Sequence, residues 1–210
     1  MTHTFGRNKN RDRMFPAILF ILCGIFLAQT LYGQKPGNPP VWKSNEALVN
    51  QLDSAKEIEG FLINPPKGYN WLTQPGPEGS KIIGWSGATR PDKTRAQLLV
   101  LTVTLPKEEL KKYNLEQILD SLVASTGQER NDWQRTRTEK GLINELLFVR
   151  TFWSGKDIRL GRKIYGFSYV TLVGEKLIQL SSQDVEPHHK EALELAESSV
   201  FTFKAATTNR

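Results

Sequence analysis

Two neighbouring segments decide the fold: KIYGFSYVTLV (163–173) and KLIQLSS (176–182), with only Gly174 and Glu175 between them. Both are rich in β-branched and aromatic residues, which favour strands. Glycine at the first of the two central positions suits a type II′ turn, and such a turn joins two strands as a hairpin. The sequence therefore predicts an antiparallel pair at this point.

Further strands are expected on both sides of this pair, over 58–64, 81–87, 96–105 and 142–155. The segment 96–105 is apolar on both faces at its start, which places it in the middle of a sheet. The polar segments 73–80 and 128–141 are expected to be loops.

Helices are predicted over 45–57, from Leu115 to Gly127, and from Pro187 onward. Asn114 and Gln117 form the pattern of a capping box at the start of the second helix. Short connections between consecutive strands, with helices set apart, indicate an α+β fold: an antiparallel sheet of about six strands with helices packed on it, preceded by a signal segment.

The N-terminus has the parts of a secretion signal. Four basic residues precede the apolar run 15–28, and smaller and polar residues follow it. We expect a signal peptide over 1–33, cleaved after Gly33 with Ala28 as second choice, a flexible spacer over 34–43 and a single domain over 44–210. The protein is then periplasmic or extracellular. The alternative is an uncleaved anchor over 15–32.

Charge and cysteine content narrow the function classes. The chain carries a formal charge of +6, and residues 1–33 hold four basic residues and one acidic, so they supply +3 of it. The remainder is weakly basic, which gives no support for nucleic-acid binding. The one cysteine, Cys23, lies in the leader, so the mature part has neither a disulfide nor a cysteine ligand for a metal.

Several segments resemble the PsbP-like/Mog-like fold family. The resemblance rests on four segments: PKGY at 66–69 followed by Trp71, a long strand ending in Leu105-Pro106 before a helix, YGFSYV at 165–170, and SSVF at 198–201. The resemblance covers about residues 58–203. It implies binding or assembly rather than catalysis, because members include an extrinsic photosystem II subunit, a Ran-binding import factor and bacterial envelope proteins. The family has no shared catalytic motif.

Catalytic patterns are weak along the chain. His188 and His189 are adjacent and point about 100° apart on a helix, so they do not clamp one metal. The chain has no Gly-x-Ser-x-Gly motif and no Gly-rich phosphate loop. Glu145 interrupts an apolar strand, and a solvent-facing side of the sheet explains it.

Tryptophan and arginine are the residues that dominate interface hot spots. The partner- or ligand-binding candidates are Trp71, Trp85, Arg90, Arg150 and Trp153. We expect a non-enzymatic exported domain that binds an envelope protein or a small ligand, with no cofactor, no metal and no nucleic acid. Membrane contact is expected only through an uncleaved N-terminal segment. A carboxylate-based hydrolase built around Glu145 is the alternative, and a structural member of a larger assembly is a third possibility.

Overall fold

The central hairpin forms as its sequence predicts. β9 (Lys163–Val173) and β10 (Lys176–Val185) pair antiparallel from Lys176 opposite Val173 to Val185 opposite Ile164. Gly174 opens the turn with φ +62°. This is the left-handed conformation that a type II′ turn requires at its first central residue, and glycine adopts it without a Cβ clash.

The computed structural model describes residues 38–76, 80–112 and 114–206. Asn38–Arg210 forms one compact unit, which contains all the elements described below together with both core clusters. This unit therefore carries its own hydrophobic core. The predicted signal peptide and the first part of the predicted spacer lie outside the described residues.

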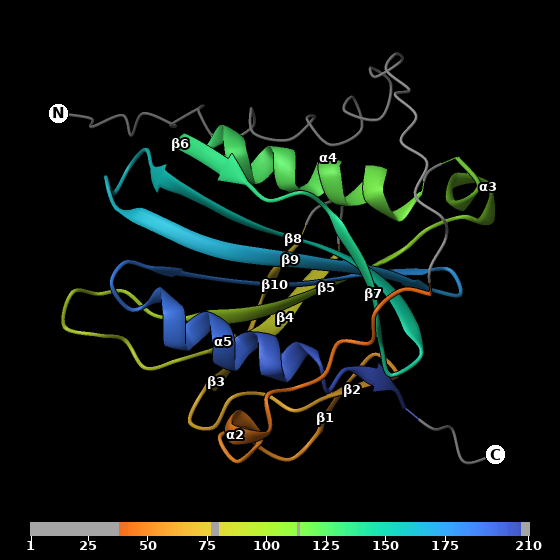
Figure 1. Ribbon diagram of the computed structural model, residues 1–210, viewed down its shortest axis with the longest axis horizontal. Coiled ribbons are helices and arrows are strands. Elements are labelled where there is room, and N and C mark those ends of the chain that lie inside the picture. The colour runs from red at the N-terminus through yellow and green to blue at the C-terminus, as the bar shows by residue number, and fades with distance from the viewer. Residues whose placement is uncertain (1–37, 77–79, 113, 207–210) are drawn as a thin grey trace, which may run out of the picture. The chain divides into compact units, whose positions relative to one another are not determined.

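The hairpin sits in the middle of an eight-stranded antiparallel sheet (Figure 1). The strand order is β3-β4-β5-β10-β9-β8-β6, and β7 also pairs with β8. The remaining strands are β3 (Asn70–Pro75), β4 (Lys81–Ser86), β5 (Gln97–Thr104), β6 (Arg130–Arg135), β7 (Glu139–Ile143) and β8 (Leu146–Asp157). The α+β class and the central place of the 96–105 strand are confirmed. The number of strands exceeds the expected six.

A smaller sheet and several helices complete the unit. The sheet has the order β1-β2-β11 and consists of β1 (Lys56–Ile58), β2 (Phe61–Ile63) and β11 (Lys204–Ala205). The helices are α2 (Glu46–Val49), α3 (Lys107–Leu110), α4 (Leu115–Gln128) and α5 (His189–Val200). No described helix is long and apolar enough to cross a membrane.

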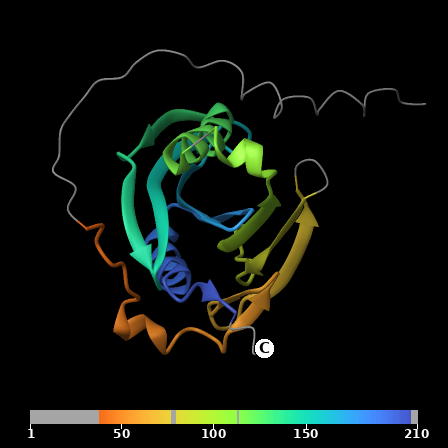
Figure 2. The same ribbon diagram turned by 90° about the vertical axis from the view of Figure 1, so that its right-hand side faces the viewer.

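The two long helices cover opposite faces of the large sheet, as the end-on view shows (Figure 2). Along β9, Phe167 and Tyr169 join the core cluster that includes α5, whereas Ile164 and Val170 join the cluster that includes α4. This alternation follows from the two-residue period of a strand. Because both faces of the central strands are covered, these strands read as nearly continuous apolar runs.

Helix α4 begins where the sequence predicts. The Asn114 side chain accepts a hydrogen bond from the Gln117 N–H, and the Gln117 side chain accepts one from the Asn114 N–H. The capping box is therefore confirmed, and it satisfies two N–H groups that the helix leaves unpaired. The helix ends at Gln128, so Gly127 lies within its last turn.

The helix predicted over 45–57 is wrong beyond its first turn, since α2 ends at Val49. The Asp53 N–H donates to the Pro65 carbonyl at 2.7 Å, and the Lys67 N–H donates to the Gln51 carbonyl at 2.8 Å. These bonds to a distant turn replace the i→i−4 bonds of a helix. Tertiary pairing has overridden the local helical pattern here.

The strands predicted over 58–64 and 142–155 are each broken by a turn. Glu59 and Gly60 turn the chain between β1 and β2, with φ of +49° and +89°. Asn144 and Glu145 turn it between β7 and β8, with φ of +46° and +70°. Glu145 is therefore an exposed turn residue, and its expected place on an open sheet face is wrong.

The polar segments expected to be loops contain two strands. β3 and β6 lie at the two ends of the strand order, and most of their side chains are exposed. An edge strand with exposed faces has no apolar alternation, so its composition matches that of a loop. This explains why the sequence pattern missed both.

Replacing Asn114 by Ala removes the side-chain half of the capping box. We expect the free energy of unfolding to fall by about 1 kcal/mol. Asn114→Ser, which keeps a capping oxygen, should lose much less. Urea unfolding of residues 34–210 measures both, and equal losses for the two variants would show that the cap does not stabilise α4.

Candidate functional site

A single arginine on the α5 face of the sheet joins four separate segments. Arg150 of β8 donates from Nη1 to the Tyr169 hydroxyl of β9 at 2.8 Å and to Glu197 Oε1 of α5 at 3.1 Å. Its Nε and Nη2 both meet Glu139 Oε2 of β7, at 2.8 and 2.7 Å. The Tyr169 hydroxyl also donates to Glu197. With Trp42, these residues form what we call the Arg150 cluster.

Trp42 covers this cluster from the N-terminal side. Its ring lies 4.2 Å from the Arg150 guanidinium carbon and meets the Tyr169 ring edge-on at 5.6 Å. A guanidinium on a tryptophan face is an attractive cation–π contact. The cluster is thus closed on one side by an aromatic ring from a segment far away in sequence.

The segment that carries Trp42 differs from the flexible spacer expected over 34–43. The Trp42 N–H donates to the Leu142 carbonyl, and the Leu142 N–H donates to the Pro40 carbonyl, both at 2.8 Å. These bonds form one parallel bridge between Val41 and β7. On the N-terminal side of this bridge, further pairing would need an N–H from residue 40, which is proline, so the pairing does not extend in that direction. We call residues 40–44 the strap.

The ring of Trp42 fits because position 141 is a glycine. A Cβ at Gly141 would overlap three carbons of the Trp42 indole ring. Glycine in a strand interior often marks such a close approach of another group. The Ser44 hydroxyl then ties the strap to α5 by donating to the Ser198 carbonyl at 2.8 Å.

Burial changes the pKa values of two groups in the cluster. It raises the pKa of the Glu197 carboxyl above its ordinary value, although the Tyr169 hydrogen bond and the Arg150 charge oppose that rise. Burial, assisted by the Glu197 charge, also raises the pKa of the Tyr169 hydroxyl well above its ordinary value. At neutral pH Tyr169 is therefore a neutral donor, and Arg150 is the cation that compensates the carboxylates.

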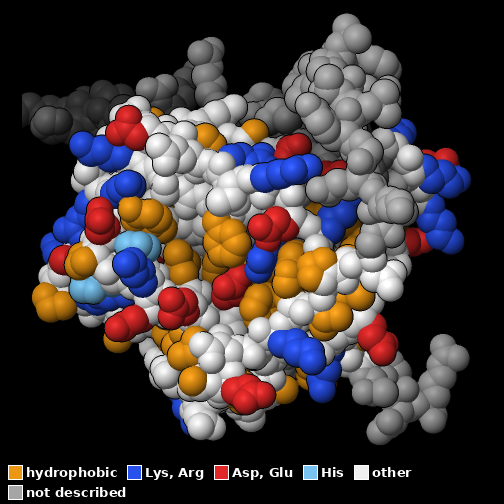
Figure 3. Space-filling model, in the orientation of Figure 1, with side chains coloured by type: hydrophobic (Ala, Val, Ile, Leu, Met, Phe, Trp, Pro, Cys, Tyr) orange, Lys and Arg blue, Asp and Glu red, His pale blue; other side chains and the backbone are white. Residues whose placement is uncertain are grey.

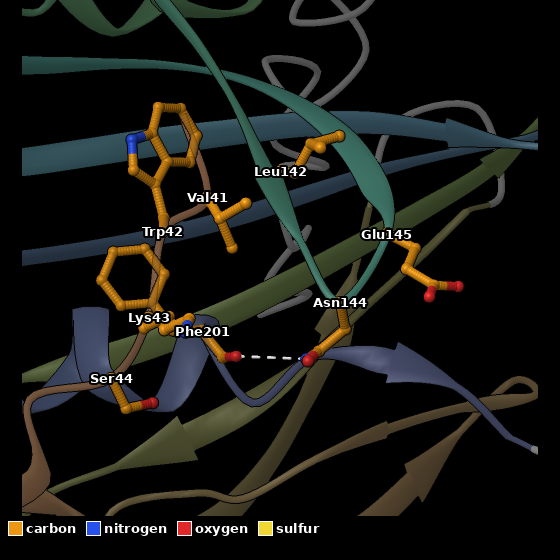
Figure 4. A pocket seen from close by; sticks show the side chains of 8 residues that line it. All are labelled: Val41, Trp42, Lys43, Ser44, Leu142, Asn144, Glu145 and Phe201. Carbon is orange, nitrogen blue, oxygen red and sulfur yellow. Dashed lines mark hydrogen bonds between the residues drawn. The ribbon is translucent and has the colours of Figure 1, made fainter. Parts of the chain in front are cut away.

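A hollow of about 410 Å³ adjoins the strap (Figure 4). Its apolar lining comes from Val41, Trp42, Leu142 and Phe201. Its polar lining comes from Lys43, Ser44, Asn144 and Glu145. The rings of Trp42 and Phe201 lie on one side, and the β7–β8 turn lies on the other (Figure 4).

The hollow is open to solvent, and Val41 on its rim is 59% exposed. Figure 3 shows hydrophobic side chains gathered on this face with acidic and basic groups among them. Ligand sites typically combine an apolar lining with a few polar groups in a volume of this order. The arrangement suits binding of an apolar side chain or a short extended segment.

The turn that borders the hollow is fixed by the chain after α5. The Asn144 Nδ2 donates to the carbonyls of Phe201 at 3.2 Å and Phe203 at 2.9 Å. Asn144 and Glu145 both hold positive φ without being glycine, which costs of the order of 1 kcal/mol for Glu145. Residues kept in strained backbone conformations cluster at functional sites.

Trp71 and Trp85 lie together on neighbouring strands. Their rings meet edge-on at 5.4 Å. Trp85 is only 3% exposed and belongs to the core, whereas Trp71 is 53% exposed on the edge strand β3. Trp85 thus packs the core and Trp71 alone offers surface.

Arg90 and Trp153 also lie away from the hollow. Arg90 makes two hydrogen bonds to the buried carboxylate of Asp184, at 2.8 and 2.6 Å, and so holds the β4–β5 loop on β10. Trp153 stacks on Trp133 on the α4 face, opposite to Arg150 of the same strand. Of the five candidates, the structure places only Arg150 beside the hollow.

The two histidines lie at the start of α5. His189 stacks on Tyr165 with ring centroids 3.8 Å apart, and His188 precedes it at the start of α5. Within the described residues, no three histidine, cysteine or acidic side chains come together as a metal site.

Trp42, Tyr169, Glu197 and Phe201 were missed by the sequence analysis as site residues. Their meeting depends on contacts between different elements, such as Arg150–Tyr169, Tyr169–Glu197 and Arg150–Glu197, which are 19, 28 and 47 positions apart along the chain. Trp42 lies further still in sequence from the two residues that it contacts, Arg150 and Tyr169. The one available signal was Trp42 itself. A large aromatic residue at the end of a Pro/Gly-rich segment is out of place in a flexible spacer.

Comparisons with known proteins support the fold and nothing finer. No protein-family model matches the chain, and no curated protein matches its sequence. The solution structure of cyanobacterial PsbP (CyanoP) from Synechocystis matches with a TM-score of 0.50 and 14% identity, over 82% of this chain and 98% of that one.

Two further solved structures match less well. The Ran-binding protein Mog1p of Saccharomyces cerevisiae gives a TM-score of 0.47 and 13% identity, over 73% of this chain and 96% of that one. LpqN of Mycobacterium tuberculosis, described as involved in cell envelope biogenesis, gives 0.48 and 8%, over 80% of this chain and 99% of that one.

The raised pKa of Glu197 makes stability depend on pH. As pH rises from the acid range, the unfolded chain releases this proton before the folded chain does, so the folded state loses relative stability. We expect the stability advantage of the native chain over Glu197→Gln to shrink as pH rises above about 4, the ordinary pKa of a glutamate carboxyl. Urea unfolding at a series of pH values measures it. Glu191→Gln, an exposed position on α5, is the control. An advantage that grows with pH would contradict the burial of Glu197.

Gly141→Ala should force the Trp42 ring away from β7. We expect a loss of about 1–3 kcal/mol in the free energy of unfolding, as for other overpacked sites. Trp42→Ala removes the clash, so the double variant should lose less than the sum of the two single losses, by about 1 kcal/mol. Urea unfolding of all four proteins completes the cycle. Strictly additive losses would show that the two residues do not touch.

Proposed function

Since the chain has the PsbP-like/Mog-like fold that its sequence predicted, we propose that it is a non-enzymatic binding domain of the cell envelope. Its hollow receives an apolar side chain or a short extended segment of another envelope protein. The observation that carries this proposal is the apolar hollow of about 410 Å³ beside the Arg150 cluster. Aromatic residues and arginine are enriched at the centres of protein interfaces.

Export is part of the proposal and rests on the sequence. The basic residues before position 15, the apolar run 15–28 and the small residue Gly33 match a secretion signal. A cysteine-free mature domain is compatible with an oxidising compartment, because it has no thiol to oxidise.

The shape of the hollow supports a protein partner over a small ligand. It is open, and an exposed valine forms its rim, so a small molecule would keep much of its surface in water. Specific small-molecule sites usually enclose most of their ligand. A side chain presented by a larger surface can bury the rim as well as the hollow.

The hydrolase alternative receives no specific support. Hydrolysis of glycosides by carboxylates requires two acidic groups across the scissile bond. Glu145 is the one acidic residue among the described residues that line the hollow. Glu139 and Glu197 are both bound to Arg150, which stabilises their charges as structural ion pairs.

The proposal is tested by photo-crosslinking in the native envelope. A photoreactive phenylalanine analogue at Val41 places the reactive group on the rim of the hollow, and the same analogue at Ala124, exposed on α4, is the matched control. We expect a discrete protein adduct at position 41 that is absent at position 124. Leu142→Lys, which puts a charge into the apolar lining, should reduce that adduct at least tenfold.

Two outcomes would count against the proposed function. The first is the same adducts at both positions, which would mean random collisions. The second is an adduct at position 41 that Leu142→Lys leaves unchanged. An adduct with a mass below that of a protein would instead indicate a small ligand in the hollow.

A further inference from the structure

The loop between β8 and β9 exposes two aliphatic side chains. Ile158 is 55% exposed and Leu160 is 66% exposed, the latter being the most exposed large hydrophobic residue among the described residues. We call residues 156–163 the β8–β9 tip. Two exposed aliphatic residues this close together require an explanation, because leaving each side chain in contact with water costs free energy.

The tip is a well-bonded turn that holds these side chains outward. The carboxylate of Asp157 is directed inward and accepts the N–H groups of Arg159 at 2.9 Å and Leu160 at 2.8 Å. The Gly161 N–H donates to the Asp157 carbonyl, also at 2.9 Å, and Gly161 has φ +66°. A side chain that caps its own turn in this way fixes the backbone. The hydrogen bonds of this turn therefore hold Ile158 and Leu160 in solvent-exposed positions.

Basic residues surround the two aliphatic ones. Lys156, Arg159, Arg162 and Lys163 lie within eight positions, and the one acidic residue among these positions is the buried Asp157. Arg162 is paired with Asp92 at 2.7 Å. Asp132 and Glu186 lie near Lys163. Within the described residues, Lys156 and Arg159 make no ion pair. Figure 3 shows hydrophobic and basic side chains close together at the left end of the view, with some acidic ones between.

We propose that the β8–β9 tip is a contact site for an anionic lipid bilayer. Ile158 and Leu160 enter the boundary between headgroups and acyl chains, and Lys156 and Arg159 bind the lipid phosphates and other anionic headgroups. Membrane-surface elements combine apolar side chains with flanking Lys and Arg in this way. A fluid bilayer accepts two protruding side chains without a matching pocket, whereas a specific protein interface buries about 800 Å² on each partner.

This inference goes beyond the proposed binding function and does not depend on it. The hollow lies at the start of β8 and the tip at its end, and twelve residues of strand span roughly 36 Å. A domain attached through its tip would hold the hollow away from the membrane, open to a partner. The tip is then a membrane contact in addition to an uncleaved N-terminal segment, which is the one membrane contact that the sequence predicts.

Vesicle co-sedimentation tests the proposal. Residues 34–210, which lack the apolar leader, are mixed with vesicles of pure phosphatidylcholine or of phosphatidylcholine with 30% phosphatidylglycerol. We expect binding to the anionic vesicles that is at least tenfold tighter than to the neutral ones and that weakens as salt increases. The double variant Ile158→Ser/Leu160→Ser should bind at least tenfold more weakly. Lys156→Gln and Arg159→Gln should each weaken binding about fivefold.

The matched control removes exposed aliphatic side chains elsewhere. Val49→Ser/Leu147→Ser changes two residues that are also partly exposed but lie outside the tip, and it should bind as the native chain does. Urea unfolding shows that each variant is folded. Binding that is equal on both vesicle types, absent on anionic vesicles, or unchanged in the Ile158/Leu160 variant overturns the proposal. If the Ile158→Ser/Leu160→Ser variant binds vesicles normally but no longer binds an envelope protein that the native chain binds, the proposal is overturned in favour of a protein partner.

The same variant separates this inference from the proposed function. A tip variant that loses vesicle binding but keeps the protein adduct at position 41 supports the tip and leaves the hollow intact. If the native chain binds vesicles as expected but gives no protein adduct at position 41, the proposed binding function is contradicted and the membrane contact of the tip is supported.

Discussion

The half-buried guanidinium of Arg150 is the group on which the α5 side of the molecule depends. Arginine has five N–H donors and is always charged, so a partly buried arginine must be surrounded by acceptors. Here the acceptors come from β7, β9 and α5, and the strap supplies an aromatic face. Removing any of these segments would leave a buried charge or donor without a partner, which is costly. These contacts therefore fix where α5 and the strap lie, and the strap and Phe201, which directly follows α5, line one part of the hollow.

β8 connects this cluster to the rest of the molecule. Its alternating side chains place Arg150 and Phe148 on the α5 face and Val149 and Trp153 on the α4 face. One end of the strand begins at the strained turn beside the hollow, and the other ends at the tip with its exposed aliphatic residues. A single long strand with well-packed faces thus keeps two surface features at a fixed separation. Loops positioned by a rigid scaffold are where binding functions are commonly found.

The fold could be predicted where side-chain pattern and structure are local. The β9–β10 hairpin follows from two apolar runs and a glycine, and α4 follows from its apolar stripe and the Asn114–Gln117 box. The wrong helix and the two missed strands share one cause. The segment 45–57 has a helical pattern, but backbone bonds to the Pro65–Lys67 turn decide its path. β3 and β6 have exposed faces, and only their pairing with β4 and β8 makes them strands. Such pairing is a long-range property, which composition does not encode.

The candidate site was harder to predict because the type of a residue does not determine whether its side chain is buried or exposed. Trp85 and Trp153 are as suitable for a hot spot as Trp71, yet both are buried. Arg90 and Arg150 are both ion-paired arginines, and the difference between them is what lies next to each pair. Arg90 holds a loop on β10 through a buried carboxylate, whereas Arg150 carries a tryptophan from a segment that a one-residue bridge attaches to the sheet. Pro40 prevents that bridge from extending toward the N-terminus. Since the strap has one bridge and no ladder of backbone bonds, it depends on its side-chain contacts as well. The hollow is therefore bounded by a segment that one backbone bridge, the Ser44 hydrogen bond and the Trp42 ring hold in place.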